Sequence, residues 1–178
     1  MSTSQNGYVV LDGDFSGPFP RLRNWHIPGV QRDLPLRDGS TGFLLIHMAT
    51  WFNRHIEKID VGYDDWGYSR RKIGGSGEWS NHASGTADDL NALKHPQGVA
   101  TLRNFTPRQI EQIHNRLELY RGCIAWGGDY RTTPDGMHWE IVRGLAAVEK
   151  RARELCNSGT IGKEILQVNP GARAVIFA

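Results

Sequence analysis

The chain has 178 residues, which is long enough for one domain with a substantial core and short for two. Its 21 basic and 19 acidic residues give a formal charge of +2 and are spread along the chain, which argues against a nucleic-acid-binding protein. No stretch approaches about eighteen consecutive apolar residues and the first residues do not resemble a secretory signal, so we expect no membrane insertion and synthesis in a cytoplasm.

The first 38 residues hold four of the eight prolines and show no sustained hydrophobic period, which predicts an irregular N-terminal arm over residues 1–38. Apolar residues then recur at near-helical spacing from Phe43 to Ile56, and Ser40 or Thr41 suits the helix cap. We therefore predict a buried first helix. Its histidines, at positions 47 and 55, are expected to be core or surface residues rather than metal ligands.

A strand is predicted from Val61 to Tyr68, and the glycine-rich loop 74–77 leads into a further strand that carries His82. Thr106 and Gln109, with a proline between them, are typical of a capped helix start, and Gly122 suits its end. The inward stripe of this helix is formed by Ile110, Ile113, Leu117 and Tyr120.

Residues 124–126 and 137–142 read as neighbouring strands, and a last amphipathic helix spans about 145–155. The pattern predicts an α+β domain in which helices pack against a small antiparallel sheet. We expect the main domain at residues 39–156, followed by an extension, 157–178, that is either packed or the start of a linker. The two cysteines, Cys123 and Cys156, have no partner at metal-ligand spacing and are expected to be reduced thiols.

The candidate chemistry lies in two clusters of polar residues, the first at 80–89 and the second at 135–140. His82 and Asp89 in the first cluster, with His138 in the second, are the ligand set that a catalytic zinc ion prefers, with the fourth position left to water. His82 and Asp89 lie seven residues apart, which would put them on opposite faces of a straight strand. A turn at Gly85 between them would let both side chains point at one ion.

These residues also carry a family resemblance. The pattern consists of Ser80, His82, Gly85, Ala87 and Asp89, followed by Asp135 and His138. It resembles the M15 metallopeptidases, which include the VanX and VanY D-alanyl-D-alanine peptidases and the L-alanyl-D-glutamate peptidases of phage endolysins. With Trp126–Tyr130 and Met137–Glu140, the chain is most similar to endolysin peptidases of phages that infect actinobacteria, over roughly residues 40 to 142. The resemblance implies the hedgehog/DD-peptidase-like zinc fold with one zinc ion.

The resemblance also implies roles for two residues outside the ligand set. Asp135 stands where the family keeps its general base, although Pro134-Asp135-Gly136 is also a good turn sequence. Arg71 stands where the family keeps an arginine that binds the substrate and stabilises the oxyanion, a task that suits the guanidinium fork. We expect its neighbour Arg70 to be an ordinary surface residue.

Further residues are expected around the site. Ser80 is predicted to form a hydrogen bond within it, and Glu140 to accept the free N–H of a ligating imidazole. Asp88 should face away from Asp89 on a strand and be exposed. Four residues are candidates to line the cleft, although the aromatic ones among them equally suit the core: Trp126, Asp129, Tyr130 and Trp139.

The sequence therefore predicts a zinc peptidase of endolysin type whose partner is the peptidoglycan stem peptide, cut at L-alanyl-D-glutamate or at a D-alanyl bond. A D-alanyl-D-alanine carboxypeptidase or dipeptidase is the alternative with the same chemistry, and a non-catalytic zinc-containing wall-binding module is the alternative of another class. We expect a monomer that is made in the host cytoplasm and reaches the cell wall after the membrane has been permeabilised.

Overall fold

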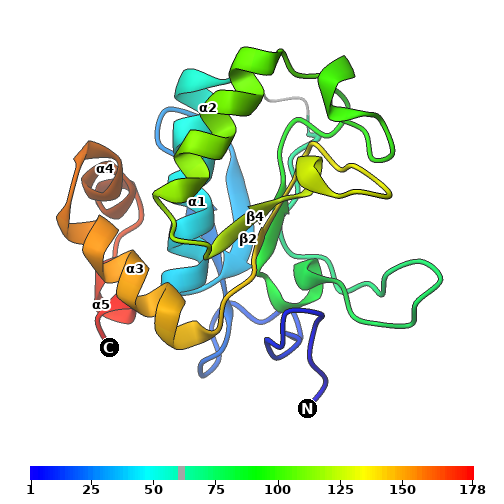
Figure 1. Ribbon diagram of the computed structural model, residues 1–178. Coiled ribbons are helices and arrows are strands. Elements are labelled where there is room, and N and C mark those ends of the chain that lie inside the picture. The colour runs from blue at the N-terminus through cyan, green and yellow to red at the C-terminus, as the bar shows by residue number, and fades with distance from the viewer. Residues whose placement is uncertain (60–62) are drawn as a thin grey trace.

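A computed structural model describes residues 1–59 and 63–178 (Figure 1). Within these residues it contains five α-helices and two small antiparallel sheets, which confirms the predicted α+β class. The first sheet pairs β1 (Leu22–His26) with β2 (Asp33–Arg37). The second has the order β3-β5-β4, from Ala87–Asp89, His138–Ile141 and Ile124–Trp126.

Helix α1 (Ser40–His55) forms the centre of the molecule. It contacts β1, β2 and β5 as well as the three C-terminal helices, and its residues from Ser40 to Asn53 are buried. Figure 1 shows the C-terminal helices on one side of α1 and the three-stranded sheet on the other. The predicted caps were wrong: Gly39 is the N-cap, with a φ of 90°, and no side chain caps this end.

The prediction of an irregular arm over residues 1–38 was wrong for the second half of this segment. β1 and β2 form a hairpin there, with Leu22 opposite Arg37 and His26 opposite Asp33. Three of its side chains are completely buried against α1 and its neighbours: Trp25, Leu34 and Leu36. The prolines obscured this hairpin in the sequence, since Pro35 lies within β2 itself.

Helix α2 (Pro107–Glu118) begins as the sequence predicted. The Thr106 side chain accepts a hydrogen bond from the Gln109 backbone N–H, and the Gln109 side chain accepts one from the Thr106 backbone. This reciprocal capping box satisfies two backbone donors that the first turn leaves without partners. Ile113 and Tyr120 of the predicted stripe are fully buried.

The C-terminal part consists of α3 (Leu145–Asn157), α4 (Thr160–Val168) and α5 (Ala172–Ile176). α4 packs against α1 and α3, and α5 packs against the same two helices, so residues 157–178 are a packed extension. Cys123 and Cys156 are free and buried, and no helix in the described part of the chain is long and apolar enough to cross a membrane.

The strand predicted over residues 61–68 is not present as such. Positions 61 and 62 lie outside the described residues, and the remainder makes a single antiparallel bridge between Trp66 and Asp89. Irregular backbone at this point brings the carbonyl of Gly67 against His82. The segment therefore supports the candidate site without extending the sheet.

Candidate active site

The structure brings His82, Asp89 and His138 together, with one potential ligand atom from each residue within 4.8 Å of the others. Asp89 and His138 are opposite partners in the β3–β5 ladder, so the pairing register alone places their side chains side by side. His82 lies in the 3-10 turn Asn81–Ser84 rather than in the strand predicted for it.

Gly85 ends this turn in the left-handed conformation, with a φ of 66°. A Cβ here would lie 2.6 Å from the backbone nitrogen of Arg37, so no larger residue fits without displacing β2. The predicted turn at Gly85 is therefore present, and His82 lies next to Asp89 at the end of β3.

The ligand atoms have the spacing that one tetrahedral ion requires. His82 Nε2 lies 3.2 Å from His138 Nδ1 and 3.3 Å from Asp89 Oδ2, and His138 Nδ1 lies 2.9 Å from Asp89 Oδ1. Zinc–ligand bonds of about 2.0–2.1 Å at tetrahedral angles place neighbouring ligand atoms about 3.3 Å apart. The two histidine nitrogens are separated by close to this value, and each lies near a different oxygen of the Asp89 carboxylate, so the donor set can hold one zinc ion with one tetrahedral position left open.

Hydrogen bonds at the far side of each ring determine which nitrogen faces the ion. His82 Nδ1 donates to the Gly67 carbonyl at 2.6 Å, which leaves Nε2 as a lone-pair donor. His138 Nε2 lies 3.5 Å from Glu140 Oε2, which leaves Nδ1 for the ion. The two histidines therefore offer different ring nitrogens to the same point.

The charges in the cluster are strongly coupled. Burial opposes ionisation of His138, but hydrogen bonds to Asp89 and Glu140 outweigh it and raise the pKa of His138 to about 10. Burial likewise opposes ionisation of Asp89, yet hydrogen bonds from both histidines hold the pKa of its carboxyl well below the usual range. The carboxylates of the cluster thus favour a positive charge between them. A bound metal ion would take the place of the extra proton on His138, because an imidazole must be neutral to bind a metal.

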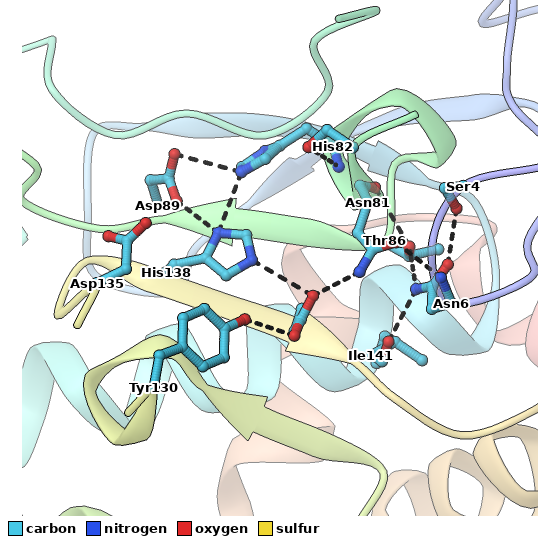
Figure 2. A network of polar contacts seen from close by, with 12 residues as sticks. Ser4, Asn6, Asn81, His82, Thr86, Asp89, Tyr130, Asp135, His138 and Ile141 are labelled. Carbon is cyan, nitrogen blue, oxygen red and sulfur yellow. Dashed lines mark hydrogen bonds and ion pairs between the residues drawn. The ribbon is translucent and has the colours of Figure 1, made fainter. Parts of the chain in front are cut away.

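Glu140 is held by three residues that Figure 2 labels, Asn81, Tyr130 and His138. Tyr130 Oη donates to Oε1 at 2.5 Å, while Asn81 Nδ2 and His138 Nε2 face Oε2 at 2.5 and 3.5 Å. Burial disfavours the charged form, but these contacts, led by that with His138, lower the pKa of Glu140 to about 2. Glu140 is therefore an ionised acceptor that faces Nε2 of His138.

Asp135 lies beside the cluster in the loop before β5 (Figure 2). Its backbone N–H donates to the Gly127 carbonyl at 2.8 Å, and its Oδ2 accepts a hydrogen bond from Gln97 Nε2 at 2.9 Å. Its Oδ1 has no hydrogen-bond partner among the described residues. Burial raises the pKa of this carboxyl, which makes it a stronger base than an exposed aspartate.

The two neighbouring arginines differ in their surroundings. Arg71 is exposed and lines the cleft beside His82. Its guanidinium makes no hydrogen bond or ion pair with residues 1–59 or 63–178. Arg70 lies over the Trp79 ring and 3.6 Å from Asp12, as expected for a surface residue. Ser80 caps the turn that carries His82 by accepting its backbone N–H at 3.3 Å.

Two cavities meet at the ligand cluster. One has a volume of about 360 Å³ and the other about 560 Å³, and both are lined by Arg71, His82, Gln97 and Asp135. The smaller cavity continues along Trp66, Ser69 and Met137. The larger one continues along Gln5, Tyr130, Thr132 and Thr133. The cleft therefore extends away from the cluster in two directions.

Asp129 and Asp88 do not lie where the sequence predicted, and Trp139 takes the core position that the sequence left open as its alternative. Asp129 is half exposed, pairs with His114 at 2.8 Å and lines neither cavity. Trp139 alternates with His138 and Glu140 on β5, so it points into the core, where it stacks on Trp126. Asp88 does face away from Asp89, but that face is buried: Asp88 is 1% exposed, and burial raises its pKa well above the usual range.

Other residues around the site were not identified from the sequence. Gln97, which contacts Asp135, and Asn81, which contacts Glu140, are both amides in loops or turns. Asn81 follows Ser80 and precedes His82, so its position next to a predicted ligand was a usable signal. Gln97 carried no comparable signal, because it approaches Asp135 only through the folding of a separate loop, tied at Gly98 N–H to the Pro134 carbonyl.

Comparison with known proteins gives one match. Residues 74–141 match the model of an M15 peptidase family described as D-alanyl-D-alanine carboxypeptidase. This segment contains the three candidate ligands and Asp135, whereas Arg71 precedes it. Searches of curated proteins and of solved structures gave no match. The match supports the M15 resemblance and indicates a peptidase, and the α+β architecture is consistent with that fold.

Proposed function

We propose that this protein is a zinc-dependent peptidase that hydrolyses an amide bond in the peptidoglycan stem peptide, as endolysins do. The observation that carries the proposal is the position of the His82, Asp89 and His138 cluster at the junction of two cavities, with Asp135 and Arg71 lining both. A peptide chain lying through this junction would pass the ion, the base and a free guanidinium at one point.

Each group has a chemical task. Bound zinc would polarise the scissile carbonyl and lower the pKa of water at the open position. Asp135 Oδ1, which has no hydrogen-bond partner among the described residues, accepts the proton of the attacking water and returns it to the leaving amine. Gln97 donates to Oδ2, the other oxygen of the same carboxylate, and so holds the side chain in place beside the ligand cluster.

Arg71 completes the arrangement. Its guanidinium is not engaged by an acidic partner in the described part of the chain, so its donors remain available to the substrate. Donors aimed at the carbonyl oxygen stabilise the negative charge that develops there in the transition state. The amine leaves along one arm of the cleft while the acyl part remains in the other.

The shape of the cleft favours an endopeptidase. An endopeptidase needs room for substrate residues on both sides of the scissile bond, and cavities of about 360 and 560 Å³ continue on both sides of the cluster. A D-alanyl-D-alanine carboxypeptidase is the second candidate, favoured by the family description of the matching segment. In that case Arg71 would bind the terminal carboxylate of the substrate instead of the oxyanion.

Mass spectrometry of digested peptidoglycan tests the proposal. Zinc-loaded protein is incubated with purified peptidoglycan beside a chelator-treated sample. New amino termini at D-glutamate or within the stem peptide, absent after chelation, are the expected result. Release of D-alanine alone would assign the protein to the carboxypeptidases, and an unchanged wall would favour a non-catalytic zinc module. In the cell, we propose a monomeric enzyme that meets its substrate after membrane permeabilisation.

A further inference from the structure

The N-terminal residues 4–6, here called the N-terminal strap, are tied to the structure around the candidate metal centre (Figure 2). Ser4 Oγ donates to Ser84 Oγ at 2.8 Å, in the turn that carries His82. Asn6 Nδ2 donates to the Ile141 carbonyl at 2.8 Å, at the end of β5. The strap therefore bridges the two segments that supply the candidate histidine ligands, although it is more than seventy residues from either in sequence.

The strap determines the orientation of the Asn81 amide. The backbone N–H of Asn6 lies 3.0 Å from Asn81 Oδ1. A backbone N–H can only donate, so the amide must present its oxygen to Asn6 and its NH₂ group to the opposite side. On that side Asn81 Nδ2 donates to Glu140 Oε2 at 2.5 Å. An amide turned the other way would set two acceptors against each other at Glu140.

Glu140 connects the Asn81 amide to His138. Its Oε2 accepts from Asn81 and faces His138 Nε2 at 3.5 Å. A carboxylate at this position keeps the proton on Nε2 and leaves Nδ1 free to bind a cation. The chain of contacts thus runs from the backbone of Asn6 through Asn81 and Glu140 to a candidate metal ligand.

We propose that the N-terminal strap is a positioning element of the metal centre, acting on His138 through Asn81 and Glu140. The proposal rests on the proposed function in so far as the ion is zinc. The residue between the two anchors, Gln5, lines the larger cavity, so the strap also forms part of the cleft wall. Segments far from the ligands in sequence would then contribute both to metal affinity and to the substrate path.

Three variants of the full chain test the role. Asn6→Ala removes the side-chain donors that anchor the strap, and Asn81→Leu removes the amide that contacts Glu140. Tyr8→Phe is the matched control, because Tyr8 Oη anchors the same arm by donating to the Arg143 carbonyl at 2.9 Å but does not contact Asn81. Thermal unfolding of each variant checks that it is folded.

Zinc affinity is measured by competition with a chromophoric chelator, and the visible spectrum of the Co²⁺-loaded protein reports the ligand geometry. A group that contacts a metal ligand directly, as Glu140 does, typically contributes about 10–100-fold to affinity. Asn81 lies one contact further out and Asn6 two, so Asn81→Leu should weaken zinc binding by up to about 10-fold and Asn6→Ala by less, and both should alter the spectrum. Tyr8→Phe should change neither.

Equal zinc affinity and identical spectra in folded Asn6→Ala, Asn81→Leu and wild type would overturn the positioning role, even if the wild type cuts peptidoglycan. Weaker binding in the two variants but not in Tyr8→Phe would support it, even if the wall remains uncut. Because the experiment measures zinc binding and not hydrolysis, it tests the positioning role independently of the proposed peptidase activity.

Discussion

Replacing Asp135 by Asn tests the catalytic reading of the site most directly, because the two side chains have nearly the same shape. The oxygen of Asn can keep the hydrogen bond that Oδ2 now accepts from Gln97 at 2.9 Å, so the side chain should keep its orientation. Oδ1, for which residues 1–59 and 63–178 offer no hydrogen-bond partner, is then replaced by an NH₂ group, which cannot take a proton from water. The substitution removes the base and little else.

The magnitude follows from this geometry. A positioned general base contributes typically 10²–10⁴-fold to the rate, so kcat should fall by that factor, or by about 3–5 kcal/mol in activation free energy. Stability should hardly change. Burial already disfavours the ionised form of Asp135, as its raised pKa indicates, so a neutral amide of equal size fits the position.

The assay compares initial rates of stem-peptide hydrolysis with zinc content and thermal stability measured on the same samples. Asp129→Asn is the matched control, since it makes the same chemical change at a half-exposed carboxylate paired with His114. It should keep wild-type activity. If fully zinc-loaded Asp135→Asn retains more than about a tenth of the wild-type kcat, the proposed base is refuted, and Asp135 serves only to turn its loop.

Four further predictions concern stability. Zinc at a hundredfold excess over its Kd should stabilise the fold by about 2.7 kcal/mol, so a chelator should lower the Tm in a thermal scan; an unchanged Tm would contradict a folded-state zinc site. Gly85→Ala should lower the free energy of unfolding by about 1–3 kcal/mol, because of the positive φ and the clash with Arg37; urea unfolding at wild-type stability would speak against this. Asp88→Val should raise the free energy of unfolding at pH 7 by about 1–3 kcal/mol, because both carboxylate oxygens lack partners among the described residues. Burial raises the pKa of Asp88 in the folded state, so the cost of ionisation in the wild type grows as pH rises above about 3.9. Below that pH, the advantage of the variant should shrink to the cost of burying a neutral carboxyl without partners. Burial, aided by Arg116 and Arg151, lowers the pKa of His47 to about 3, so the unfolded chain binds the extra proton below about pH 6.5. Wild type should lose roughly 2 kcal/mol more than His47→Gln between pH 7 and pH 5 in urea titrations, and equal losses would rule out a buried neutral imidazole.

Several features of this protein were determined by short stretches of sequence. The start of α2 was predictable because Thr106, Pro107 and Gln109 act within one helical turn, where contacts depend only on local spacing. The grouping of His82, Asp89 and His138 was predictable because residue type and order restrict the ligand set, and Gly85 marks the turn between the first two. Helix α1 followed from its apolar spacing, although its cap did not.

The remaining features depend on contacts between distant segments. The pairing of β1 with β2 buries a segment whose prolines suggested an irregular arm. The register of β3 against β5 places Asp88 opposite Trp139, and both side chains face inward. Asn6 contacts Asn81 only because the amino-terminal segment packs next to the turn that carries His82. A sequence specifies which groups are present and their local conformation, whereas burial and long-range hydrogen bonds depend on which surfaces meet once the whole chain has packed.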